Sequence, residues 1–162
     1  MYIHYIMTDF ARAARTIATE CVCIRVRQAS RALTKNYDDA LRAVGIQISQ
    51  LAVLVAVAMF GEPGASIHAL AEVLVMDRTT LSRNLRPLER LGLLRVARSP
   101  TDARTRLVLL TRQGERAIEA AYPVWQRAQQ EVRGLVGTSQ ARSVRDGADG
   151  LLAALGRAGI PS

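Results

Sequence analysis

Arginine and hydroxyl side chains gather on one face of a short predicted helix, Asp77 to Leu91. Leu81, Leu85 and Leu88 recur there at i, i+4 and i+7, so they line one face that must be buried. Arginine donates two parallel hydrogen bonds to a phosphate or to a guanine edge. The opposite face and its flank carry Arg78, Thr79, Ser82, Arg83, Arg86 and Arg90. Such a basic surface predicts a polyanionic partner.

A shorter helix is predicted just before this one. Ser66 is suited to cap a helix that carries Leu70, Ala71 and Leu74 on one side, and only a few residues of turn remain before Asp77 caps the next helix. Two helices joined by a tight turn, the second with an arginine-rich outer face, form a helix-turn-helix. In that motif the second helix lies in the major groove of DNA, so we expect a DNA-reading module here.

A basic β-hairpin is predicted directly after the second helix. Gly92 ends that helix, residues 94–98 and 105–110 have the composition of strands, and turn-forming residues connect them at 99–104. The tip of this hairpin carries Asp102 and Arg104. An arginine at such a tip suits the narrow, electronegative minor groove of DNA.

Three ordered segments in this region, Leu88 to Leu93, Arg98 to Arg104 and Leu110 to Gly114, resemble the signature of MarR-type winged-helix transcriptional regulators. The resemblance implies that Asp77 to Leu91 is the recognition helix, and that Asp102 orients Arg104 in the minor groove. Two residues depart from the family pattern. Gln47 stands where the family has threonine, a better N-cap, and Pro87 removes a hydrogen bond late in the recognition helix and should kink it.

The whole chain has the composition of one basic globular domain. Its 162 residues are 49% hydrophobic and carry a formal charge of +8, and 21 of the 22 basic residues are arginine. This balance favours a nucleic-acid partner. No apolar run is long enough to span a bilayer and no signal peptide is evident, so we expect a cytoplasmic protein without membrane contact.

The terminal segments are predicted to be helices that build a dimer. Residues 9–42 form one helix, or two joined near Asn36, and start at Thr8-Asp9. Thr111 caps a helix that Pro123 bends and that Gly134 and Gly137 end, before a last helix at 139–156. The fold class is therefore mainly α, with a two-stranded β-wing: one domain, 1–162, with a winged helix at about 46–111 and dimerisation helices at about 9–42 and 112–158. The resemblance implies a homodimer on a pseudo-palindromic operator.

Cys23, Tyr37 and Trp125 are candidate effector or redox residues. The resemblance implies a pocket for a small aromatic or phenolic molecule, which Tyr37 and Trp125 could line, although both also suit core packing. The segment from Cys23 to Arg31 is similar to the reactive-cysteine segment of peroxide-sensing members, with Tyr37 as the only tyrosine partner. The alternative is a buried, unreactive Cys23 that packs as a small hydrophobe.

The leading hypothesis is a sequence-specific DNA-binding regulator, a repressor released by a small ligand. The alternatives are a cysteine-based peroxide sensor and a weakly specific architectural DNA-binding protein, since phosphate contacts alone supply affinity without sequence preference. An enzyme is not expected, because no phosphate-binding loop, serine elbow or zinc-ligand spacing occurs. His68 and Glu72 stand at i, i+4 without a further recognisable ligand, so we expect neither a metal nor a cofactor.

Overall fold

The computed structural model describes residues 2–102 and 104–157. Residue contacts divide the chain into two compact units, Met1–Asn36 and Tyr37–Ser162. The candidate interface belongs entirely to the second unit. The organisation of residues 1–162 as a single domain stays a prediction.

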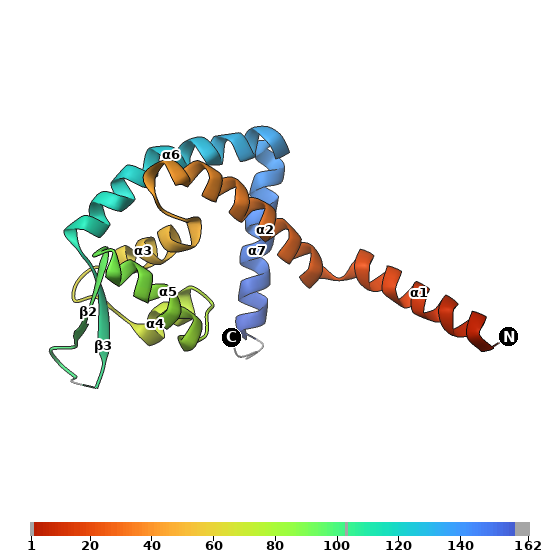
Figure 1. Cartoon of the computed structure of the whole chain (residues 1–162), viewed down its shortest axis with the longest axis horizontal. Coiled ribbons are helices and arrows are strands. Elements are labelled where there is room, and N and C mark those ends of the chain that lie inside the picture. The colour runs from red at the N-terminus through yellow and green to blue at the C-terminus, as the bar shows by residue number, and fades with distance from the viewer. Residues whose placement is uncertain (1, 103, 158–162) are drawn as a thin grey trace. The chain divides into compact units, whose positions relative to one another are not determined.

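The first unit is helical. Helix α1 spans Tyr2–Glu20, and helix α2, Val22–Leu41, begins after a break at Cys21 and continues into the second unit (Figure 1). The predicted helix start at Thr8-Asp9 is therefore wrong. Both alternatives for residues 9–42, one uninterrupted helix or two helices joined near Asn36, are wrong as well, because the break lies at Cys21. Asparagine is only mildly unfavourable inside a helix, so Asn36 does not interrupt α2. Exposed apolar side chains in this unit are Phe10, Ile17, Val22, Val26 and Leu33.

The second unit contains a winged helix followed by two long helices. After the 3₁₀ turn η1, Arg42–Val44, come helix α3, Ile48–Phe60, strand β1, Ala65–Ser66, and helices α4, Ile67–Val73, and α5, Arg78–Arg90. Strands β2, Leu94–Arg98, and β3, Arg106–Leu110, form the hairpin, which extends away from the helices (Figure 1). Helices α6, Arg112–Val136, and α7, Thr138–Arg157, complete the described chain.

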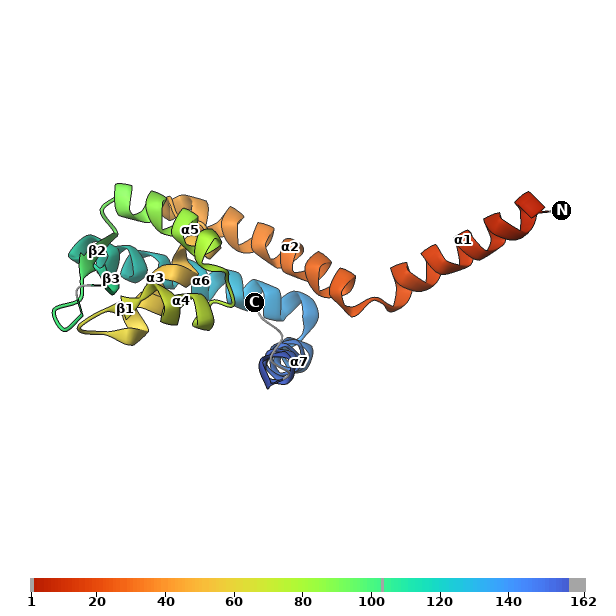
Figure 2. The same cartoon turned by 90° about the horizontal axis from the view of Figure 1, so that it is seen from below.

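The sheet has three antiparallel strands in the order β1-β3-β2. The predicted hairpin of β2 and β3 is confirmed, and β1 is a third strand that the sequence did not predict. Strand β1, labelled in Figure 2, pairs through Ala65 with Val108 and through Ser66 with Leu107. Two residues carry no usable alternation of polar and apolar side chains, and only the pairing with β3 makes them a strand.

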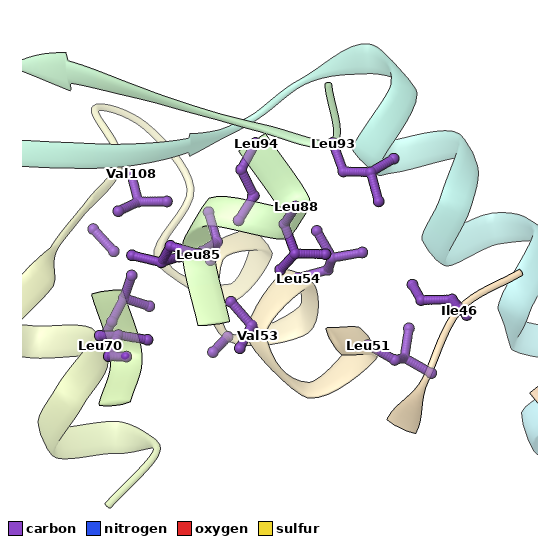
Figure 3. Packing of buried hydrophobic residues seen from close by; sticks show 14 of the residues in the cluster. Ile46, Leu51, Val53, Leu54, Leu70, Leu85, Leu88, Leu93, Leu94 and Val108 are labelled. Carbon is purple, nitrogen blue, oxygen red and sulfur yellow. The ribbon is translucent and has the colours of Figure 1, made fainter. Parts of the chain in front are cut away.

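The hydrophobic core joins α3, α4, α5 and the sheet. Leu54, Leu70, Leu88 and Val108 are fully buried, and Leu94 nearly so. In Figure 3, Leu85 and Leu88 lie between the hairpin strands and helix α3. Each fully buried leucine contributes about 1.5–3 kcal/mol, so this cluster fixes the position of α5 against the sheet.

Helix α3 has no threonine at its N-cap, and a residue of helix α2 caps it instead. The carboxylate of Asp38, from the end of α2, accepts a hydrogen bond from the Ile48 N–H at 2.6 Å. The Gln50 side chain accepts another from the Gln47 N–H at 2.9 Å. Asp38 therefore supplies the capping oxygen at the helix start where Gln47 replaces threonine.

Two helices continue through residues that were expected to disturb them. Helix α5 runs through Pro87 to Arg90, and the Leu91 N–H still donates to the Pro87 carbonyl at 3.0 Å. Helix α6 runs through Pro123 and Gly134 and ends at Gly137, whose φ is 84°. The prediction that Gly134 breaks α6 is therefore wrong; glycine inside a helix costs only about 1 kcal/mol.

No single described helix is long and apolar enough to cross a membrane. One bent pair, Val22–Val44 with Ile48–Phe60, meets the criterion of length and composition. Its second member is α3, in which Leu51, Val53 and Leu54 are buried in the protein core.

Candidate nucleic-acid interface

Helix α5, the predicted recognition helix, starts at a well-formed cap. The Asp77 carboxylate accepts hydrogen bonds from the Thr80 N–H, at 2.8 Å, and from the Thr80 hydroxyl. These bonds favour the charged carboxylate and lower the pKa of Asp77 below its ordinary value. The predicted start of the helix at Asp77 is confirmed.

Helix α5 separates its two faces as the sequence indicated. Leu81, Leu85 and Leu88 are buried in the core, and Ser82 is half-buried on the flank. The solvent-exposed side chains are Arg78, Thr79, Arg83, Arg86 and Arg90. The structure thus presents a basic, hydrogen-bonding face to solvent, which can lie in a groove of a polyanion. Which atoms each side chain contacts stays a prediction.

The turn between α4 and α5 contains a backbone conformation that the sequence does not reveal. Ser66 caps α4 by accepting from the Ala69 N–H at 3.1 Å. In the turn, Val75 has a φ of 52°, which is rare for a β-branched residue. The Met76 N–H, donating to the Ala71 carbonyl at 2.9 Å, helps to hold this geometry. The strained turn sets the angle at which α5 leaves α4.

His68 lies at the start of the exposed basic face. Its Nε2 is 3.4 Å from a Glu72 oxygen, and its Nδ1 is 3.4 Å from an Arg78 nitrogen. His68 and Glu72 form a surface pair, with Arg78 beside the imidazole. Within residues 2–102 and 104–157, no group of three histidine, cysteine or acidic residues could hold a metal ion.

The tip of the hairpin is held by Asp102. Its carboxylate accepts from the Arg104 N–H at 3.0 Å and from the Thr105 hydroxyl at 2.8 Å, and these bonds lower the pKa of Asp102. The resemblance implied that Asp102 orients Arg104. The hydrogen bond that the structure shows is to the backbone of Arg104, so Asp102 fixes the turn while the Arg104 side chain is exposed.

The three candidate effector residues have different surroundings. The Tyr37 hydroxyl donates to the Gln129 side chain at 2.6 Å, and burial raises the pKa of Tyr37. Trp125 packs against the core and stacks on Tyr122 with ring centroids 6.1 Å apart. Cys23 is exposed, so the interpretation of a buried packing cysteine is wrong for the described chain. An effector or redox role for these three residues stays a prediction.

Sequence reasoning missed two residues that position this module, Asp38 and Gln129. Asp38 caps α3 from ten residues upstream, and Gln129 accepts from a tyrosine 92 residues earlier. A capping motif can be recognised in a sequence because its two partners lie three residues apart. The partners in these two contacts lie much farther apart, so the sequence alone does not indicate either contact.

Comparisons with known proteins agree with this geometry. A model of the MarR family matches residues 44–105. MosR, a transcriptional regulator of M. tuberculosis solved in complex with DNA, is 34% identical with a TM-score of 0.75, and the match covers 86% of this chain and 98% of MosR. The chain belongs to the MarR family. The resemblance seen in the sequence motifs is thereby confirmed, and the family consists of transcriptional regulators, not enzymes.

Two further relatives define the extent of the likeness. The transcriptional regulator HosA of Escherichia coli O111:H- is 38% identical over 85 residues, which are 52% of this chain; the chain spans 62% of the length of this curated relative. A mutant MarR of E. coli complexed with operator DNA has a TM-score of 0.75 at 20% identity, covering 85% of this chain and 97% of that protein. At that identity the likeness shows the winged-helix fold alone.

Proposed function

We propose that this MarR-family chain is a homodimeric, sequence-specific DNA-binding transcriptional regulator of the cytoplasm. It acts as a repressor that a small ligand releases from its operator. The observation that carries this proposal is the exposed face of α5, where four arginines stand beside Thr79 and opposite a buried leucine row. MosR, the relative at 34% identity, was solved on DNA.

In the proposed complex, α5 enters the major groove and the hairpin tip enters the next minor groove. Arg83 and Arg86 reach base edges or phosphates from the middle of α5, and Arg78, Thr79 and Ser82 serve its N-terminal part. Arg104 enters the minor groove, on a turn that Asp102 holds in shape.

A homodimer accounts for the apolar surface of the terminal helices. Leu135 of α6 is 81% exposed and Leu152 of α7 is 50% exposed, with further apolar side chains at Val136, Val144, Leu151 and Leu155. Soluble monomers rarely leave so many apolar side chains exposed together, and a second copy of the chain would cover them symmetrically. Two recognition helices would then read half-sites about 34–36 Å apart.

The release mechanism rests on family membership, which makes a small aromatic or phenolic effector the first class to test. Trp125 and Tyr122 offer stacked rings to such a molecule. Oxidation of the exposed Cys23 is the alternative trigger.

The proposal is tested by footprinting on the DNA next to the chain's own gene, followed by affinity measurements on the protected site and on a random duplex. We expect protection of a pseudo-palindrome and a preference of at least about 10³ over random DNA. Equal affinity for both duplexes would support an architectural protein instead.

Removal of residues from Thr138 onward should abolish the dimer and operator binding together, whereas a truncated monomer that still binds the operator would contradict the dimer.

A further inference from the structure

The hairpin carries two arginines that face each other across its strands. In the register of β2 and β3, Arg98 lies directly opposite Arg106, and both side chains are exposed. Side chains of directly opposed residues project from the same face, with Cβ atoms about 4.5–5.5 Å apart. Two positive charges are therefore held close together at this position.

Neither arginine forms an ion pair with an acidic side chain in the described part of the chain, residues 2–102 and 104–157. The acid at the hairpin tip, Asp102, has one oxygen bonded to the Arg104 N–H and the other to the Thr105 hydroxyl. Like charges directly opposite each other destabilise a hairpin, and an anion bound between them would relieve that repulsion.

The pleat places the pair between the two DNA-reading parts. Side chains alternate along a strand, so Arg98 shares its face with Val96 and Leu94, and Arg106 shares its face with Val108. This face packs on the core that also contains Leu85 and Leu88 of α5. The two arginines extend it beyond the core, toward the hairpin tip.

In the proposed complex, a sugar-phosphate strand of the duplex lies between the two DNA-reading parts. One sugar-phosphate strand separates a major groove from the neighbouring minor groove, so a protein that occupies both must cross that strand. We propose that Arg98 and Arg106 together bind a single backbone phosphate of the strand between the groove that α5 occupies and the groove that the hairpin tip occupies. This inference rests on the proposed function, and it adds a phosphate site that fixes how the wing sits on DNA.

The test compares the unaltered chain with Arg98→Gln, Arg106→Gln and the double variant, by fluorescence anisotropy on operator and random duplexes at several salt concentrations. Neutralising one phosphate changes the slope of log K against log salt by about 0.9. The proposed homodimer carries one such pair in each protomer, so we expect the double variant to lose about 1.8 of slope in all. It should bind both duplexes about a hundredfold more weakly at low salt, about tenfold for each protomer. Each single variant should keep most of the slope, because the remaining arginine still neutralises the phosphate.

Thermal unfolding without DNA provides a second measurement. Either single variant removes the repulsion between the opposed charges, so its midpoint should rise by roughly 1–3 °C at low salt. The matched control is Arg95→Gln, because Arg95 is an exposed arginine on the same strand but on the opposite face. It should change neither the slope nor the midpoint.

Each contrary result has a distinct meaning. A double variant that behaves like Arg95→Gln refutes the phosphate site. A slope loss of about 3.6, which corresponds to two phosphates for each protomer, shows that the arginines bind separate phosphates and refutes a shared one. A loss on the operator alone assigns the pair to base contacts and refutes the proposal as well. If the unaltered chain binds neither duplex, the proposed function itself fails, whatever the variants do.

Discussion

Gly114 lies where the start of helix α6 meets the first residues of the hairpin, and no larger residue fits there. Gly114 is buried, and its N–H donates to the Thr111 hydroxyl oxygen at 3.1 Å. The same hydroxyl donates to the Gly92 carbonyl at 2.6 Å. A Cβ added to Gly114 would come within 3.0 Å of the Leu93 carbonyl oxygen and would lie 2.9 Å from the Leu110 side chain.

Gly114→Ala should therefore destabilise the protein by about 3 kcal/mol. The nearest obstacle is backbone, so α6 must shift as a unit, and overpacking of this kind costs about 1–3 kcal/mol or more. Disturbing the Thr111 cap adds about 1 kcal/mol, which the better helix propensity of alanine roughly offsets. For a chain of this size the unfolding midpoint should fall by about 6–12 °C.

Chemical and thermal denaturation followed by circular dichroism measure this effect. The matched control is Gly134→Ala in the same helix, where an added Cβ meets nothing within 4 Å. That variant should gain about 0.4–1 kcal/mol, since alanine loses less conformational freedom on folding. If the two variants unfolded at the same midpoint, the close approach of α6 to the hairpin would not be a constraint on the fold.

Four other outcomes are expected. Arg104→Ala should weaken operator binding by about 1–3 kcal/mol at unchanged stability, and unchanged affinity would show that the hairpin tip does not reach DNA. Val75→Asn should raise the unfolding free energy by about 1 kcal/mol, because asparagine tolerates the positive φ that strains valine; a lower midpoint in a melt contradicts this. The pKa of Asp77 is lowered in the folded state, so the stability that its cap of α5 contributes is fully present above about pH 4 and is lost as the pH falls through the folded-state pKa. Asp77→Asn should therefore flatten this part of the curve of unfolding free energy against pH. An unchanged curve argues against the cap. Organic hydroperoxide should leave operator affinity unchanged, since the Tyr37 hydroxyl already donates to Gln129, and release that is lost in Cys23→Ser would establish a sensor instead.

The sequence by itself determined the parts of this protein that short-range rules govern. Ser66, Asp77 and Thr111 each cap the helix that begins after them, because a capping oxygen reaches only two or three residues along the chain. The two faces of α5 follow from a period of 3.6 residues, and strand β2 follows from residues that favour strands between turn formers. These local signals were also sufficient to identify the family.

The tertiary structure decided what depends on residues far apart in the chain. Ala65 becomes part of a strand only because Val108 pairs with it, and α3 is capped only because the end of α2 brings Asp38 to it. The opposition of Arg98 and Arg106 depends on the register of two strands, which a shift of one residue would destroy. Such contacts arise when separate elements pack together, and their energies do not leave a repeating pattern in the sequence.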